Sequence, residues 1–242
     1  KCTPPTKKLT FLGVYIDSTT RTISLDPAKA FELTLLLEKW KKKKSSTKKE
    51  LQKIIGKLQW AATIFRASRP YVRRLVNLAN SVQRQSHTVF LSNDDHLDFE
   101  WWIQNLTNLH KTTVFKCDLP PVSAYIQSDS SMVAAGGIFN DDWFHVSWPT
   151  DFEWDEKIHI NDRETAALLL CALRWAHLWH GKTIMFMTDN TCTMFGTNKG
   201  SCKSKLAQQC HRELTTLSYL HNFSFSVMYL KGEYNIWADA AS

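Results

Sequence analysis

Four acidic residues occupy positions from which a folded chain can bring carboxylates together. Asp129 and Asp189 each end a run of β-forming or apolar residues, Glu164 opens a long helical pattern, and Asp239 lies near the end of the sequence. Carboxylates at strand ends and at a helix start can converge on one edge of a sheet, where their mutual repulsion requires cations. Hard divalent ions such as Mg²⁺ take such oxygen ligands together with water and phosphate. Two such ions, about 3.5–4 Å apart, can drive in-line hydrolysis of a phosphodiester.

Each of these carboxylates also has a simpler explanation when it is taken alone. An Asp at a strand end is commonly a turn or capping residue, and Glu164 can serve the positive end of its helix. The prediction of a metal site therefore depends on the joint order D–E–D–D and on the elements that carry the four residues.

The C-terminal part of the sequence supplies those elements. Hydrophobic periodicity predicts strands at 122–128, 132–139, 143–148, 183–187 and 223–230, with helices at 161–180 and 205–220, a short helix after the fourth strand and a terminal helix from Tyr234. The order βββαβαβα predicts an α/β fold, a mixed five-stranded sheet flanked by helices.

The N-terminal part predicts a hairpin followed by a small helical domain. The β-rich runs of residues 9–25 form the hairpin, and Asp26 with Pro27 then opens a first helix. Thr47 and Glu50 have the spacing of a capping box that starts a second helix, and a third helix follows Pro70. We therefore divide the chain into a hairpin and helical domain (1–85), a connector (86–120) and the α/β domain (121–242).

Charge is divided unevenly between these parts. Residues 1–85 hold 19 Lys and Arg against 5 Asp and Glu, whereas residues 86–242 hold 11 against 18. Lys49, Lys53 and Lys57 recur at helical spacing as a cationic ridge, and Arg73 and Arg74 are expected outward on the third helix. A basic half beside a carboxylate-rich half favours binding of a polyanion, although a solvated basic face without a partner is the alternative.

Several segments of residues 121–242 resemble the ribonuclease H family. They are AYIQSDSSMVAAGGIF, NDRETAALLLCALRWAHLW, MTDNTCTMFG and KGEYNIWADAAS. The resemblance implies that Asp129, Glu164, Asp189 and Asp239 are catalytic carboxylates that bind two Mg²⁺ ions, with Mn²⁺ as an alternative. Asp129 would bridge the ions. Asn161, three residues before Glu164, matches a position that contacts the RNA strand in this family.

The N-terminal part resembles a retroelement reverse transcriptase. LTFLGVYID and SLDPAKA look like the last palm hairpin, or primer grip. TKKELQKIIGKLQWAATIFRASRPYVRRLVNLA looks like the thumb, most like that of tyrosine-recombinase retrotransposons of the DIRS type, and DFEWWIQNL looks like their connector. The expected partners are an RNA–DNA hybrid and the remaining fingers and palm of the polymerase. Because the sequence has no Y-x-D-D motif, it is not expected to polymerise DNA by itself.

The predicted function is therefore endonucleolytic hydrolysis of the RNA strand of RNA–DNA hybrids, which leaves a 5′-phosphate and a 3′-hydroxyl. In this prediction Lys49, Lys53, Lys57, Arg73 and Arg74 neutralise phosphates. The sequence departs from many members of the ribonuclease H family at Tyr229, where those relatives have His. This departure bears on the rate of cleavage and on the pH dependence of that rate.

Three alternatives stay open at the level of sequence. The first is a non-catalytic nucleic-acid-binding remnant of a retroelement polymerase. The second is a DNA-cutting nuclease of related fold, such as an integrase or resolvase, and the third is a scaffolding subunit. Cleavage assays with hybrid and with DNA duplex separate them.

Composition gives the expected setting. No stretch approaches the ~20 apolar residues of a membrane span, and the six cysteines are scattered without a C-x-x-C pair, which suits a reducing compartment. We expect an intracellular protein, cytoplasmic or nuclear, with no membrane partner and an oligomeric state that the sequence leaves open. Because the chain begins with Lys1 and not Met, it is expected to be a fragment of a longer protein.

Overall fold

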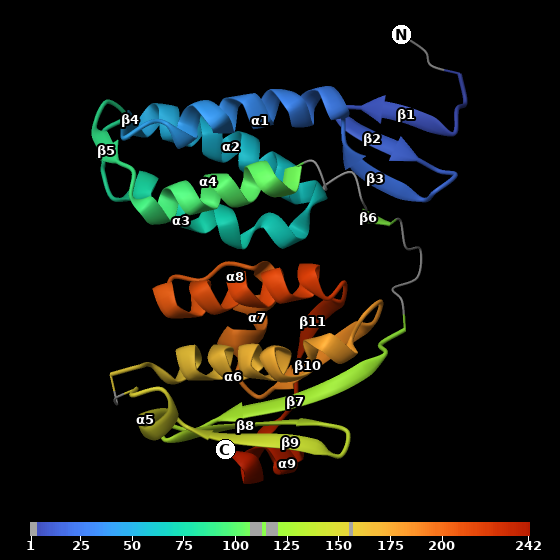
Figure 1. The fold of residues 1–242 in the computed structure, drawn as a ribbon, viewed down its shortest axis with the longest axis vertical. Coiled ribbons are helices and arrows are strands. Elements are labelled where there is room, and N and C mark those ends of the chain that lie inside the picture. Colours follow the sequence, from blue (N-terminus) through green and yellow to red (C-terminus); the bar gives the residue numbers. More distant parts are fainter. Residues whose placement is uncertain (1–3, 107–112, 115–120, 155–156) are drawn as a thin grey trace. The chain divides into compact units, whose positions relative to one another are not determined.

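The computed structural model describes residues 4–106, 113–114, 121–154 and 157–242. The chain forms two compact units, Lys1–Leu119 and Pro120–Ser242, and each is a separate body with its own core. Figure 1 labels their helices and strands.

Unit 1 combines a small antiparallel sheet with four helices. Strands β1 (Lys8–Phe11), β2 (Val14–Asp17), β3 (Thr22–Leu25) and β6 (Thr113–Val114) form the sheet in that order, and β4 (Ser45–Thr47) pairs with β5 (Thr88–Phe90). The helices are α1 (Pro27–Lys41), α2 (Lys48–Ile64), α3 (Pro70–Asn80) and α4 (Asn93–Leu106), and the 3₁₀ turn η1 is Arg66–Ser68.

The predicted helix starts are confirmed by their hydrogen bonds. Asp26 caps α1 by accepting from the backbone N–H groups of Ala28 and Lys29, and Thr47 and Glu50 form the reciprocal capping box of α2. Such caps satisfy N–H groups that the first helical turn leaves without partners.

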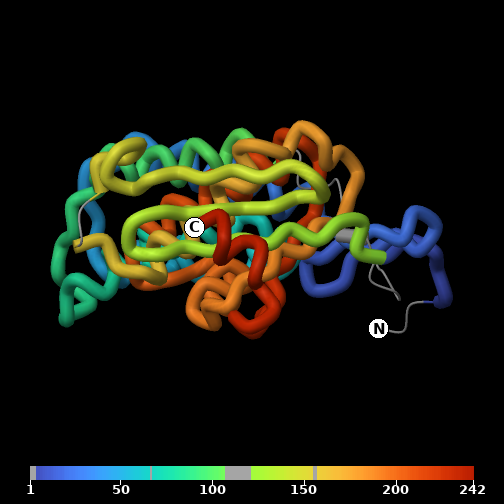
Figure 2. Tube along the Cα trace, turned by 90° about the horizontal axis from the view of Figure 1, so that it is seen from below, coloured from blue at the N-terminus to red at the C-terminus, as the bar shows by residue number. Residues whose placement is uncertain are grey.

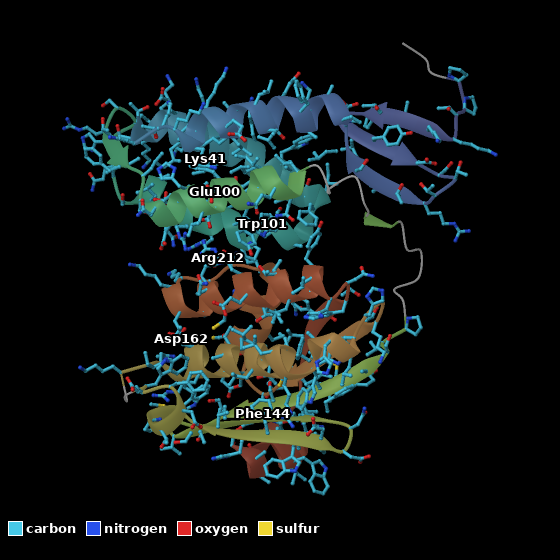
Figure 3. The ribbon with its side chains drawn as sticks, viewed as in Figure 1. Lys41, Glu100, Trp101, Phe144, Asp162 and Arg212 are labelled. Atoms are coloured by element: carbon cyan, nitrogen blue, oxygen red, sulfur yellow. The ribbon has the colours of Figure 1, made fainter. Side chains whose placement is uncertain are left out.

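Helix α4 belongs to the packed core of unit 1, although its residues lie in the segment expected as a connector. Phe99, Trp102 and Leu106 are fully buried. Trp101 stacks on Tyr71 of α3 with ring centroids 3.8 Å apart, and Lys41 Nζ of α1 lies 2.8 Å from Glu100 Oε1 (Figure 3). The described part of this segment therefore contributes to packing, while the predicted domain limits stay a prediction.

Unit 2 confirms the predicted mixed five-stranded sheet. Its strands are β7 (Ala124–Ser130), β8 (Ala134–Phe139), β9 (Asp142–Ser147), β10 (Thr183–Thr188) and β11 (Ser224–Tyr229), in the order β11-β10-β7-β8-β9. Strands β7, β8 and β9 pair antiparallel, whereas β10 runs parallel to both β7 and β11.

Helices cover both faces of this sheet. They are α5 (Trp148–Asp151), α6 (Ile160–Trp175), α7 (Thr191–Lys199), α8 (Lys205–Leu220) and α9 (Ile236–Ala241), with 3₁₀ turns η2 (Ala176–Leu178) and η3 (Gly232–Tyr234). In Figures 1 and 2, α6 and α8 lie on one side of the sheet, and the short α9 crosses β7 and β8 on the other. Among the described residues, no helix has both the length and the apolar character that a membrane crossing requires.

Two consecutive glycines of β8 let helices approach both faces closely. A Cβ atom on Gly136 would lie 2.5 Å from the backbone of Ala241 in α9. A Cβ atom on Gly137 would lie 2.5 Å from Phe144 Cε1 and 2.6 Å from Cys171 Sγ of α6. Successive strand residues point to opposite faces, so each glycine serves a different helix.

We predict that Gly137→Ala lowers the free energy of unfolding of unit 2 by about 1–3 kcal/mol, because the added methyl group overpacks the core. Urea denaturation followed by tryptophan fluorescence measures this. The matched control is Gly56→Ala in α2, where the structure leaves open space for a Cβ atom. This control should stabilise unit 1 by roughly 0.5–1 kcal/mol, since alanine favours a helix interior over glycine. An unchanged midpoint for Gly137→Ala would contradict the close packing of Gly137 against Phe144 and Cys171.

Candidate metal centre and nucleic-acid contacts

Three of the four predicted carboxylates meet at one edge of the sheet in unit 2. Asp129 lies near the end of β7 and Asp189 directly follows β10, and the ends of these adjacent parallel strands share an edge. Glu164 lies near the start of α6, which packs on β7. One carboxylate oxygen from each residue lies within 4.8 Å of the others.

Burial and mutual repulsion make these carboxylates hard to ionise. Burial, with the charges of Asp129 and Asp189, raises the pKa of Glu164 to about 8. Burial also raises the pKa values of Asp129 and Asp189, with Asp239 adding repulsion in both cases. Desolvated carboxylates beside like charges favour bound protons or cations. The cluster is therefore a place where the chain concentrates negative charge that a cation can neutralise.

Hydrogen bonds fix the orientation of two of the carboxylates. Thr188 Oγ1 donates to Glu164 Oε2 at 3.3 Å, and the backbone N–H of Ser130 also donates to this carboxylate. Ser242 Oγ donates to Asp129 Oδ2 at 2.7 Å, and Asn235 Nδ2 lies 3.4 Å from Asp129 Oδ1. Asn235 is fully buried and also donates to the carbonyl of Ser128, so it ties the start of α9 to β7.

Asp239 lies beside this cluster and not within the compact group of three. It is exposed on α9, and its side chain contacts the carboxylate of Asp129. Its charge also raises the pKa of Asp189. The predicted role of Asp239 as a fourth ligand is compatible with this position and stays a prediction.

The donor set suits hard divalent cations. All three groups offer carboxylate oxygen, which Mg²⁺ and Mn²⁺ favour, whereas zinc and copper sites are typically built with His or Cys. A cation would also relieve the repulsion that raises the pKa values of these groups. The residues that the structure brings together therefore fit Mg²⁺ or Mn²⁺.

Asn161 lies in the first turn of α6, within one turn of Glu164. Its Oδ1 accepts a hydrogen bond at 2.9 Å from Nδ2 of Asn190, the N-cap residue of α7. The sequence prediction included Asn161 and missed Asn190. The available signal was an Asn directly after the strand-end Asp189 and at the start of a helix, which is typical of a cap.

The segment after β11 runs along the same edge. Tyr229 ends β11 opposite Thr188 in the parallel register, and it is 44% exposed. Leu230 N donates to the carbonyl of Thr188, and a Cβ atom on Gly232 would lie 3.3 Å from Asp189 Oδ2. Tyr229 therefore lies on the strand whose continuation passes the carboxylates.

The predicted phosphate contacts in unit 1 differ in how accessible they are. Lys49, Lys53 and Lys57 are exposed at intervals of four on α2. Arg73 is half-buried on α3. Arg74 forms ion pairs at 3.5 Å with Asp94 and with the buried Asp98, so a phosphate would compete with these carboxylates. The three lysines are thus the better placed of the five predicted residues.

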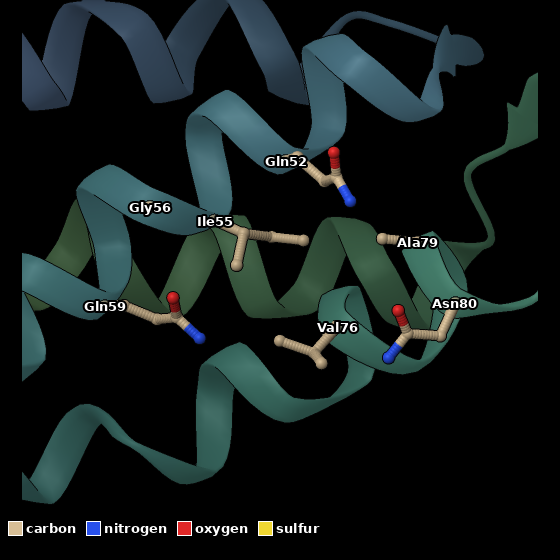
Figure 4. Close-up of a pocket in the computed structure, with 7 residues that line it drawn as sticks. All are labelled: Gln52, Ile55, Gly56, Gln59, Val76, Ala79 and Asn80. Atoms are coloured by element: carbon tan, nitrogen blue, oxygen red, sulfur yellow. The ribbon is translucent and has the colours of Figure 1, made fainter. Parts of the chain in front are cut away.

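A groove lies between α2 and α3 (Figure 4). Its volume is about 230 Å³, and its lining residues are Gln52, Ile55, Gly56, Gln59, Val76, Ala79 and Asn80. The side-chain amides of Gln52, Gln59 and Asn80 offer both hydrogen-bond donors and acceptors. A Cβ atom on Gly56 would have no neighbouring atom within 4 Å. The sequence signal was the exposed face of α2 next to the lysines, which the prediction did not use.

No protein-family model matches this sequence, and no curated protein matches it. Solved structures do. Ribonuclease H1 of Halobacterium salinarum is 16% identical, with 49% of this chain and 91% of that chain covered and a TM-score of 0.37. The N-terminal RNase H domain of a Mycobacterium tuberculosis protein, fused to maltose-binding protein, is 10% identical, with 49% and 94% covered and a TM-score of 0.38.

The foamy viral protease-reverse transcriptase in complex with an RNA/DNA hybrid is 14% identical over 92% of this chain, with a TM-score of 0.36. This chain spans only 29% of that chain's length. At these identities and scores, function must be inferred from the residues of this chain.

We predict that Glu164→Gln stabilises the metal-free protein at high pH. Because folding raises the pKa of Glu164 from 4.5 to about 8, its contribution to stability is full below the unfolded pKa and is lost as the pH rises through about 8. At about pH 9 the variant should exceed wild type by on the order of 3–5 kcal/mol, and at about pH 5 by much less. Urea denaturation in EDTA across this range measures the difference.

The same variant should lose the rise in melting temperature that Mg²⁺ gives to the wild type. The control is Glu213→Gln on α8, an exposed carboxylate that accepts from Gln209. This variant should change neither the stability at high pH nor the rise in melting temperature with Mg²⁺. Equal Mg²⁺ stabilisation of wild type and Glu164→Gln would exclude Glu164 as a ligand.

Proposed function

We propose that this chain carries a ribonuclease H, a phosphodiester hydrolase that cuts the RNA strand of RNA–DNA hybrids endonucleolytically. The observation that carries the proposal is the group of three carboxylates, Asp129, Glu164 and Asp189, with oxygens within 4.8 Å at one sheet edge. The resemblance of residues 121–242 to the ribonuclease H family supports it, as does the mixed sheet of unit 2.

In this proposal Asp129, Glu164, Asp189 and Asp239 hold two divalent cations, Mg²⁺ or Mn²⁺. Held by these residues, such cations would supply activation of the attacking water and stabilisation of the leaving oxygen of the phosphodiester. The chain itself supplies the orientation of the ligands. Thr188 holds the carboxylate of Glu164, while Ser242 and Asn235 hold that of Asp129.

Unit 1 is the proposed site of nucleic-acid binding. Lys49, Lys53 and Lys57 would contact phosphates, which positions a duplex without reading its sequence. The thumb-like sequence of this unit supports an origin in a retroelement reverse transcriptase, most like the DIRS type, whose fingers and palm are the proposed partner. Arg73 and Arg74 remain candidate contacts beside the ridge.

The alternative is a non-catalytic nucleic-acid-binding remnant, for which the basic residues 1–85 alone would suffice. The buried carboxylates argue against it. Their repulsion and desolvation destabilise the fold in the absence of cations, and simple binding to a polyanion gains nothing from such a cluster. Tyr229 in place of the His of many relatives is the observation that most favours the alternative.

We predict that the wild-type chain cuts a labelled RNA–DNA hybrid with Mg²⁺ or Mn²⁺ and not with EDTA. Asp189→Asn should lower the cleavage rate by at least about 100-fold, because one ligand of the metal centre loses its charge. Binding of the hybrid should persist, since the lysines of unit 1 are unchanged. Gel analysis of the end-labelled RNA strand measures cleavage, and fluorescence anisotropy measures binding.

Duplex DNA and duplex RNA are the substrate controls, and Asp151→Asn is the matched variant, a carboxylate of α5 outside the cluster. Binding of the hybrid without cutting under either metal would favour the binding remnant or an enzyme that needs its polymerase domain. Cutting of duplex DNA would favour the DNA-nuclease alternative.

We further predict that replacing Lys49, Lys53 and Lys57 together with Gln weakens hybrid binding and its salt dependence. The slope of log affinity against log salt should fall by about 0.9 for each phosphate that the variant no longer neutralises. The maximal cleavage rate at saturating hybrid should stay near wild type, because these residues bind and do not react. Anisotropy titrations at several salt concentrations measure the slope.

Lys182→Gln is the matched control, an exposed lysine at the opposite end of β10 from Asp189. It should leave the slope unchanged. An unaltered slope in the triple variant would show that the duplex binds elsewhere.

A further inference from the structure

Two asparagine side chains join the starts of α6 and α7 beside the metal centre. Asn161 is in the first turn of α6, and Asn190 caps α7 directly after Asp189. Their side chains are half-buried and hydrogen-bonded to each other at 2.9 Å.

The polarity of this amide pair is determined by a backbone group. The backbone N–H of Thr193 can only donate, so the Asn190 atom that it contacts at 2.9 Å must be Oδ1. Asn190 therefore turns Nδ2 toward Asn161, and the Asn161 atom that accepts must be Oδ1. With Oδ1 of Asn161 bonded to Asn190, the remaining polar group of the Asn161 side chain is its NH₂ group, a hydrogen-bond donor. Among the residues that the structure describes, none accepts a hydrogen bond from it.

The pair is also tied to the carboxylates. Asn190 N donates to Thr188 Oγ1 at 3.2 Å, and the same hydroxyl donates to Glu164 Oε2 at 3.3 Å. The carbonyl of Asn161 accepts from Thr165 Oγ1 at 2.8 Å, which fixes the backbone that carries the amide. The donor of Asn161 is thus held in a defined position relative to Glu164.

We propose that Asn190 is a positioning residue that holds the Asn161 amide as a hydrogen-bond donor for a ribose 2′-hydroxyl of the RNA strand. This inference rests on the proposed function, because it needs a hybrid at the carboxylates. A donor at this position finds the 2′-hydroxyl oxygen in RNA and no counterpart in DNA. Acceptors on the bases are common to both nucleic acids, so they give no preference for the hybrid. Asn190 has both side-chain groups engaged by protein and acts on substrate through Asn161.

The test is the ratio of affinities for an RNA–DNA hybrid and a DNA duplex of the same sequence. Binding is measured by anisotropy in Ca²⁺ with the full chain. Asn190→Asp keeps the volume and the cap, since Asp caps helices as well as Asn does. It offers only acceptors, so Asn161 must turn its NH₂ group inward and present oxygen to the substrate. The 2′-hydroxyl can then bond this oxygen only by turning its own proton toward it, which leaves the hydroxyl oxygen without the donor that wild-type Asn161 supplies. The ratio should fall about three- to tenfold, the effect of one hydrogen bond.

The matched control is Thr191→Asp, which adds the same charge at the neighbouring exposed position outside the amide pair. Added charge weakens binding of both duplexes alike, so this variant should keep the wild-type ratio. In an Asn161→Ala background, Asn190→Asp should cause no further fall, because its effect passes through Asn161.

The proposal is overturned by a wild-type chain that does not prefer the hybrid, or by an unchanged ratio in Asn190→Asp. It is also overturned by an equal fall in Thr191→Asp, or by an added fall in the Asn161→Ala background. Cleavage of the same hybrid in Mg²⁺ by wild type and Asp189→Asn separates this result from the proposed function. Cleavage with an unchanged ratio rejects the role of the amide pair alone, and a changed ratio without cleavage rejects cleavage by this chain on its own while the role of the amide pair stands.

Discussion

Repulsion among two buried carboxylates and a half-buried one is the constraint on which the arrangement at this edge of unit 2 depends. Asp129 and Glu164 are 7% and 3% exposed, and each feels the charge of Asp189. Such a group is stable only if the fold supplies hydrogen bonds and if bound protons or cations reduce its charge. The parallel pairing of β7 with β10 supplies the shared edge, and the start of α6 supplies the third carboxylate with the positive end of a helix.

The close approach of α9 to the sheet completes this arrangement. Ser242 and Asn235 reach Asp129 only because α9 lies directly on β7 and β8. That contact depends on Gly136, where any side chain would collide with the backbone of Ala241. Gly136, which has no side chain, thus allows the packing of α9 that orients Asp129, a proposed metal ligand. The exposed Asp239 is carried to the cluster by the same helix.

The elements could be predicted from sequence because they follow from local periodicity, and the convergence of the carboxylates could be expected from the joint order D–E–D–D on those elements. The sequence placed Asp129 and Asp189 at strand ends, which can share an edge of a sheet, and the structure shows the parallel pairing of β7 with β10 that brings them together. The ion pair of Arg74 with Asp98 could not be predicted, because it joins two helices whose packing is set by the apolar core. Asn190 was missed for a similar reason. Its type indicates a cap, but its second partner, Asn161, lies 29 residues away in the chain.

The distribution of charge gives two parts of the sequence a different relation to a polyanion. Residues 86–242 carry 18 acidic against 11 basic side chains, and their acidic cluster repels phosphate unless cations occupy it. Residues 1–85, with 19 basic against 5 acidic, attract a duplex whether or not cations occupy the acidic cluster. Long-range attraction therefore comes from the basic part, which reads no sequence and does not distinguish RNA from DNA. In the proposed function, discrimination must then arise at short range, from neutral groups such as the Asn161 amide. An amide suits this task because it adds a directional hydrogen bond to the acidic edge without adding a charge that would compete with the cations.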